Sequence, residues 1–125
     1  MNLVKKVVLR KSDLFSKIRD CEKFDLIVSN PPYIPINQKD TLQKELSFEP
    51  ICALFSQDVE GLEFYKKIIK DAKKYLKPQG FLAFEVGVNQ AQKVKTMLEK
   101  DFEDIQITPD LAGIERVVCA KLKNI

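Results

Sequence analysis

Asn30, Pro31, Pro32 and Tyr33 form the run of residues in this 125-residue chain whose types and order best indicate chemistry. They directly follow FDLIVS (residues 24–29), a nearly continuous apolar run typical of a strand covered on both faces. In an open parallel sheet, ligands bind beyond the carboxyl ends of the strands, where Asn30 would stand. An isolated Asn-Pro pair is more often a simple turn. The preceding strand, the two stiffening prolines and the aromatic residue favour a site instead.

The side-chain oxygen of Asn30 and the backbone carbonyl of Pro31 can both accept hydrogen bonds from one NH2 group. An amide nitrogen is a poor nucleophile because its lone pair is delocalised into the carbonyl, so two acceptors would orient it and raise its electron density. Tyr33 can stack on a planar amide or base and contact a cation through its ring. The chain contains no histidine, which excludes imidazole catalysis and histidine-ligated metals within this polypeptide. We therefore expect catalysis by positioning, without a metal.

The elements that must position these residues alternate between strand and helix. Predicted strands cover residues 4–9, 24–29, 81–86, 102–108 and 116–122. Predicted helices cover residues 16–22, 59–77 and 89–100, and residues 34–58 form a long loop. This order predicts an α/β sandwich whose sheet is mostly parallel, with an antiparallel pair of strands at its C-terminal edge.

Composition narrows the class of protein. The chain is 45% hydrophobic and 31% charged, and it has no apolar run near the roughly 20 residues that a membrane span requires. Its size predicts one domain. Three widely spaced cysteines (Cys21, Cys52 and Cys119) favour free thiols in a reducing cytoplasm. A net charge of only +3 favours a solvated surface over a nucleic-acid groove.

Other polar and aromatic residues are weaker candidates for the site. Glu85 ends a predicted strand, where it could bind cofactor or substrate or serve a structural role. Glu45 and Glu49 lie in the long loop and could meet substrate. Structural roles are expected for the remaining candidates, which are Asp58 and Glu60 at a helix start, Tyr65 and Tyr75 in the core, Asp110 in a turn, and Arg116 as a structural or interface charge.

Several blocks beyond Asn-Pro-Pro-Tyr occur in the order of one known family. They are residues 12–15 (SDLF), 48–50 (FEP), 61–65 (GLEFY), 76–82 (LKPQGFL), 85–87 (EVG) with Gln90, and 110–113 (DLAG) with 116–118 (RVV). Together they resemble the HemK-type peptide chain release factor glutamine methyltransferases, which are class I enzymes that use S-adenosylmethionine. The likeness extends over nearly the whole chain.

The resemblance implies methylation of the side-chain N5 of the glutamine in the Gly-Gly-Gln motif of class 1 release factors, in the cytoplasm. It assigns the glutamine amide to Asn30, Pro31, Pro32 and Tyr33, with Asn30, Pro31 and Tyr33 as the catalytic group. It also places Asn30 near the cofactor and assigns the adenine to the region of Asp13 and Leu14. Family members often have an aromatic residue at the position of Leu14, so that assignment is the weaker one.

The same resemblance indicates what the sequence lacks. The four glycines form no G-x-G loop for the cofactor, and neither the ribose-binding acid of the second strand nor the family's N-terminal helical domain is present. Residues 1–125 are therefore expected to form a partial catalytic domain, the C-terminal portion of a Rossmann-like class I sheet, with weak cofactor binding. The family strand order 3-2-1-4-5-7-6 would leave the FDLIVS strand at an open edge, which predicts self-association there or a displaced N-terminal strand.

Two other functions fit the signature. Adenine-N6 methyltransferases of nucleic acids use the same four residues, because the adenine amino group presents the same chemical problem. The chain could also be a non-catalytic remnant or a partner-binding module that keeps the substrate half alone.

Overall fold

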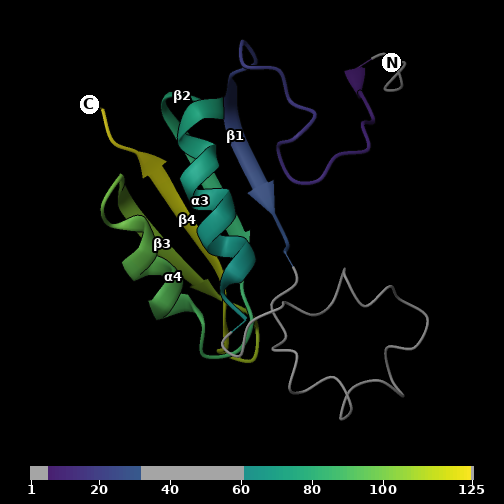
Figure 1. Ribbon diagram of the computed structural model, residues 1–125. Coiled ribbons are helices and arrows are strands. Elements are labelled where there is room, and N and C mark those ends of the chain that lie inside the picture. The colour runs from purple at the N-terminus through teal and green to yellow at the C-terminus, as the bar shows by residue number, and fades with distance from the viewer. Residues whose placement is uncertain (1–5, 32–60, 125) are drawn as a thin grey trace, which may run out of the picture.

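The computed structural model describes residues 6–31 and 61–124, which form one four-stranded sheet and two helices (Figure 1). The elements, in chain order, are β1 (Phe24–Ser29), α3 (Glu63–Tyr75), β2 (Leu76–Glu85), α4 (Ala91–Leu98), β3 (Phe102–Pro109) and β4 (Glu115–Leu122). The sheet order is β1-β2-β4-β3. β1 runs parallel to β2, whereas β4 is antiparallel to both β2 and β3. The α/β class and the antiparallel C-terminal pair are thus confirmed.

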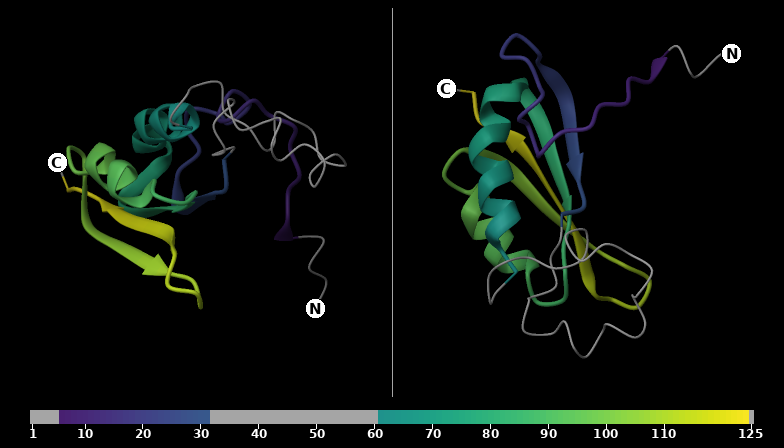
Figure 2. Two further views of the ribbon diagram at one scale, coloured as in Figure 1. Left: turned by 90° about the horizontal axis from the view of Figure 1, so that it is seen from below. Right: turned by 45° about the vertical axis from the view of Figure 1, so that its right-hand side comes forward.

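Both helices lie on one face of the sheet, and no described helix covers the other face (Figure 2, left). Strand residues alternate between the two faces, so Leu82, Phe84 and Val118 point toward the helices and are almost fully buried. From the helices, Tyr65, Val94 and Leu98 meet them at spacings that put apolar side chains on one side of each helix. Each large side chain buried in this way contributes about 1.5–3 kcal/mol to folding.

β2 begins earlier than predicted. The helix that was expected to extend to Lys77 ends at Tyr75, and the strand starts at Leu76 rather than Phe81. The register with β1 shifts between the pairs Phe24–Leu76 and Leu26–Phe81. Pro78 therefore lies in a part of β2 that does not pair with β1, which suits a residue without a backbone N–H. Gly80 is required there, because a Cβ atom at this position would lie 2.9 Å from the carbonyl oxygen of Lys77.

Two N-terminal predictions are wrong. The expected strand at residues 4–9 is not formed by its described residues 6–9, and Val7, Val8 and Leu9 are exposed. A strand needs a neighbouring strand to pair its backbone N–H and C=O groups, so an apolar pattern alone is not sufficient to form one. The expected helix at residues 16–22 is instead a series of turns closed by short-range backbone bonds such as Ser16 N to Asp13 O.

The other boundaries agree closely with the predictions. β1 matches its predicted range, β3 and β4 are each one residue longer, and α4 is two residues shorter at each end. The sheet as described is mixed rather than mostly parallel, because no N-terminal strand joins β1 and only one of the three pairings is parallel. The predicted loop at residues 34–58 lies outside the described residues.

Candidate active site

Asn30 stands just beyond the carboxyl end of β1, as the sequence predicted, and its side chain is exposed. Pro31, the next residue, is buried. Ser29 pairs with Phe84 in the parallel ladder, so Asn30, which follows β1, and Glu85, the last residue of β2, lie at the same end of the sheet. An exposed amide thus sits between a paired strand and a buried proline, which fixes its backbone while leaving its side chain accessible.

The adjoining backbone of β2 is held by a buried polar cluster around Gln90. The side-chain oxygen Oε1 of Gln90 accepts a hydrogen bond from the N–H of Gly87 at 2.9 Å and lies 3.2 Å from the hydroxyl of Tyr65. Its Nε2 donates to the carbonyl of Gly61 at 3.4 Å. The Tyr65 hydroxyl also lies 3.1 Å from the carbonyl oxygen of Glu85. Two segments, residues 61–65 and 85–90, are thereby tied together at the carboxyl end of β2.

The sequence analysis did not predict the hydrogen bonds of this cluster. Tyr65 was expected in the core and is fully buried there, but its hydroxyl also contacts the Glu85 backbone. Gln90 was noted only as part of a resemblance, yet it is buried. The spacing of the residues could have predicted this burial. Gln90, which caps the start of α4, lies four residues before Val94 and eight before Leu98, on the inward side of the helix. A glutamine on such a stripe requires buried hydrogen-bond partners.

The two residues assigned to adenine precede β1. Asp13 and Leu14 line a surface cavity of about 350 Å³ together with α3 residues, among them Asp71 and Lys74. Neighbouring Phe15 stacks on Tyr75 with 4.9 Å between ring centroids, at the end of α3. The assignment of Asp13 and Leu14 to the adenine stays a prediction.

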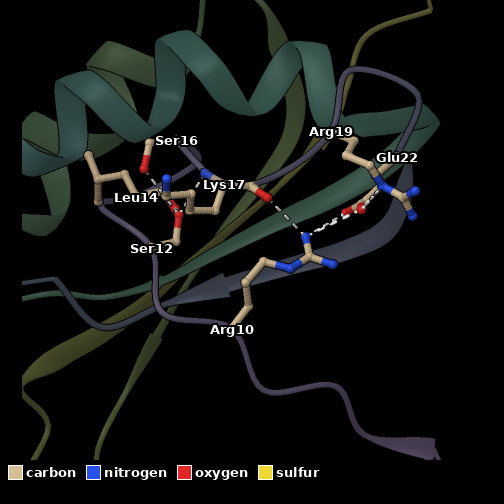
Figure 3. A network of polar contacts seen from close by, with 7 residues as sticks. All are labelled: Arg10, Ser12, Leu14, Ser16, Lys17, Arg19 and Glu22. Atoms are coloured by element: carbon tan, nitrogen blue, oxygen red, sulfur yellow. Dashed lines mark hydrogen bonds and ion pairs between the residues drawn. The ribbon is translucent and has the colours of Figure 1, made fainter.

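The segment that carries Asp13 is closed on itself by polar contacts (Figure 3). The Arg10 guanidinium donates to the Lys17 carbonyl at 3.2 Å and forms an ion pair with Glu22 at 3.1 Å. Ser12 Oγ donates to the Leu14 carbonyl at 2.8 Å and holds Leu14 in a left-handed conformation with φ 52°. These contacts expose the Asp13 carboxylate at the tip of a tight turn.

These residues match an adenosyl cofactor only at its adenine end. An exposed carboxylate such as that of Asp13 can accept hydrogen bonds from an exocyclic amino group. The described glycines Gly61, Gly80, Gly87 and Gly113 lie far apart in sequence and form no loop that could approach a ligand closely. The described part of the chain therefore supplies no set of residues for the ribose or the methionine portion.

Charged residues near the sheet end have structural partners. Arg116 donates to the carbonyl of Val86 and pairs with Asp110, both at 3.5 Å. Asp110 Oδ1 accepts from the backbone N–H groups of Ala112 and Ile114, and the bond from Ile114 is the main reason that the pKa of Asp110 is lowered. The expected turn role of Asp110 and structural role of Arg116 are both confirmed.

Several predicted site residues fall outside the described residues, namely Pro32, Tyr33, Glu45, Glu49, Asp58 and Glu60. Across residues 6–31 and 61–124, no three metal-ligating side chains converge into a site for an ion. In the same two ranges, no helix has the length and apolar character needed to cross a membrane. Cys21 and Cys119 are free thiols, as predicted.

Solved structures define the class to which this fold belongs. The chain superposes with a TM-score of 0.51 and 27% identity on the release factor-specific protein-(glutamine-N5) methyltransferase of Alicyclobacillus acidocaldarius, over 81% of this chain and 50% of that one. The fold is that of class I methyltransferases. A family model described as "Eco57I restriction-modification methylase" matches residues 4–103, and the chain belongs to this family.

Two curated relatives carry more specific names. The release factor glutamine methyltransferase of Fusobacterium nucleatum is 44% identical over 97% of this chain. The ribosomal protein uL3 glutamine methyltransferase of Xanthomonas campestris is 38% identical over 93% of it. The chain spans only 34% and 37% of the lengths of these relatives. The resemblance inferred from the sequence is confirmed, and the family name and the relatives' names differ in the substrate that they indicate.

Proposed function

We propose that this chain carries the substrate-amide part of an S-adenosylmethionine-dependent methyltransferase that acts on the N5 nitrogen of a protein glutamine, in the Gly-Gly-Gln motif of class 1 release factors. The observation that carries this proposal is the exposed side chain of Asn30, fixed between the last residue of β1 and the buried Pro31. The names of the relatives from Fusobacterium and Xanthomonas support it, since both specify glutamine.

In this mechanism the Asn30 side-chain oxygen and the Pro31 carbonyl each accept a hydrogen bond from one N–H group of the glutamine amide. The cofactor supplies an electrophilic methyl group when bound. Fixing the nitrogen in line with that group supplies the rate enhancement, and no histidine base is required because the proton can leave after the methyl group arrives. Pro32 and Tyr33 are proposed to complete the amide site, and Asp13, Leu14 and Asn30 to contact the cofactor. Residues 1–125 would then form one partial catalytic domain.

The test is a chimera in which this chain replaces the matched 34% of the Fusobacterium enzyme. Transfer of labelled methyl groups is measured with release factor, with DNA and with neither. We expect modification of release factor, and Asn30→Ala should lower the rate about 100-fold through misplacement of the nitrogen. Asn124→Ala, at another exposed asparagine, is the matched control and should leave the rate unchanged. A fully active Asn30→Ala chimera would remove Asn30 from the mechanism.

The family description favours a second candidate, N6 methylation of adenine in nucleic acid. Phosphate binding requires unpaired basic side chains arranged along a groove. Some of the described lysines are instead paired with carboxylates, as in Lys73–Asp101 and Lys74–Asp20 at 3.0 and 2.7 Å, and the net charge of the whole chain is only +3. Nucleic acid is therefore the less favoured substrate, and labelling of DNA but not release factor in the same assay would reverse this order.

The chain by itself is proposed to bind the cofactor weakly, because Asp13, Leu14 and Asn30 are its only proposed contacts and its described glycines form no loop for the ribose and methionine portions. Calorimetric titration with S-adenosylmethionine tests this proposal, and micromolar affinity would contradict it. Placement in the cytoplasm and self-association along β1 remain predictions. Activity of the chain without any added protein would also contradict the proposed weak binding.

A further inference from the structure

A hollow of about 380 Å³ opens at the end of the sheet opposite Asn30. β1 begins there, and α3 and β4 both end there (Figure 1). We call this space the basic hollow, and its lining residues are Lys23, Lys73, Leu76, Pro78, Leu122, Lys123 and Asn124. None of these lining residues is acidic, and none belongs to the proposed amide or cofactor site.

Two of the three lysines are held in place by carbonyl groups at the ends of the helices. Lys23 Nζ donates a hydrogen bond to the carbonyl of Lys74, in the last turn of α3. Lys123 Nζ donates to the carbonyls of Glu99 and Lys100, just after α4, at 3.0 and 3.3 Å. The last carbonyls of a helix lack partners within it and attract cations. These bonds therefore fix two ammonium groups beside the hollow before any ligand arrives.

The positive charge at the hollow is only partly offset. Lys73 pairs with the carboxylate of Asp101 at 3.0 Å. Lys23 and Lys123 instead bind neutral carbonyls, and among the described residues no carboxylate forms an ion pair with either of them. Because an ammonium group carries three N–H donors, each of these two lysines can donate a further hydrogen bond. The hollow therefore offers both charge and donors to an anionic ligand.

The surface between the lysines is aliphatic. Leu76 and Leu122, which are 3% and 9% exposed, line it together with the exposed Pro78. No aromatic side chain is among the described lining residues, so the hollow provides no ring on which a nucleic-acid base could stack. A complementary ligand combines carboxylates with an aliphatic group. A peptide that carries an aliphatic residue among acidic ones has this chemistry.

We propose that the basic hollow is a docking site for an acidic peptide segment of a partner protein. The segment places an aliphatic side chain against Pro78 and pairs its carboxylates with Lys23, Lys73 and Lys123. Charge complementarity selects this ligand, since three lysines from separate parts of the chain meet at one aliphatic surface. A nucleic-acid phosphate chain is the competing occupant, but it would leave the aliphatic surface uncovered.

The experiment titrates the complete chain with a blocked Glu-Glu-Leu-Glu-Glu peptide and follows binding by calorimetry and by backbone amide NMR signals. We expect saturable binding with the largest signal changes at residues 76–79 and 122–124. A blocked Gln-Gln-Leu-Gln-Gln peptide should bind about tenfold more weakly, because it lacks the charges. Raising the ionic strength should also weaken binding of the acidic peptide, because exposed charges are screened by salt.

Two variants test the hollow itself. Pro78→Asp places a carboxylate in it without removing a lysine contact and should weaken binding about tenfold, whereas the matched control Pro78→Ala should change it by about twofold or less. Lys23→Gln keeps an N–H donor but loses the charge and should weaken binding about threefold. Its control is Lys70→Gln, at an exposed position of α3 that does not line the hollow, and it should leave binding unchanged.

Circular dichroism verifies that the variants fold, and Lys23→Gln tests the hollow independently of the proline position. Equal binding of the neutral peptide, full binding by both Pro78→Asp and Lys23→Gln, or signal changes confined to other residues would each overturn the proposal. A single-stranded oligonucleotide that displaces the peptide and binds more tightly would also overturn it. The outcome does not depend on methyl transfer, because no residue of the hollow belongs to the amide site.

Discussion

The two faces of the sheet are built from the same strands but have opposite environments. On the covered face, Leu82, Phe84 and Val118 pack against α3 and α4 and are 0–1% exposed. On the opposite face, called the open face below, the alternate residues Phe81 and Val117 are 43% and 39% exposed. That face also carries charges, because Lys121 and Glu85 are the ladder partners of Phe81 and Val117. The comparison teaches that the buried core of the described residues lies on one face of the sheet.

The largest expected effect comes from two phenylalanines of β2 that point to opposite faces. Phe84→Ala leaves a cavity beside Tyr65, whose ring centroid lies 5.2 Å from that of Phe84, and should cost about 3–5 kcal/mol of unfolding free energy. Phe81→Ala on the open face should cost about 1 kcal/mol or less. Urea denaturation measures both. Equal losses would show that the open face is covered in solution.

The next effect concerns the buried glutamine of the covered side. Gln90→Ala removes the partners of Gly87 N–H and the Gly61 carbonyl and should cost about 1–3 kcal/mol, because buried polar groups are left unsatisfied. The matched variant Gln92→Ala, at an exposed position of the same helix, should change stability by about 0.5 kcal/mol or less. A neutral Gln90→Ala would show that the cluster does not hold the sheet end together.

A third prediction uses a thiol of the open face as a probe. Burial raises the pKa of the Cys119 thiol, which lowers the fraction of its reactive thiolate near neutral pH, and Cys119 is also less accessible than the exposed Cys21. Peptide mapping after alkylation should show slower modification of Cys119 than of Cys21. Cys119 reacting as fast as Cys21 would contradict the partial burial of this position.

The smallest effect is expected at the turn between β3 and β4, which belongs to neither face. The backbone N–H of Ile114 holds the pKa of Asp110 below its ordinary value in the folded chain. The stabilisation is therefore complete above the pKa of the unfolded state and is lost as the pH falls through the lowered folded value. Asp110→Asn should flatten this part of the pH dependence of unfolding measured in urea. An unchanged acid limb would exclude Asp110 as a source of that dependence.

The sequence by itself determined most local features. The periods of the apolar residues gave β1 at its observed bounds and placed α3, α4, β3 and β4 within a few residues, because alternation and helical spacing depend on neighbours along the chain. It also placed Asn30 at the end of a strand. Its ordered blocks of residues indicated the family that the comparisons confirm.

Only the tertiary structure decided features that depend on partners distant in sequence. The apolar residues 7–9 did not become a strand, because a strand needs a neighbour for its backbone groups. The buried side chain of Gln90 has hydrogen-bond partners only because the fold brings Gly61, Tyr65 and Gly87 to it. The exposure of Leu26 and Val28 likewise follows from which of the described elements pack together rather than from the pattern of any one segment.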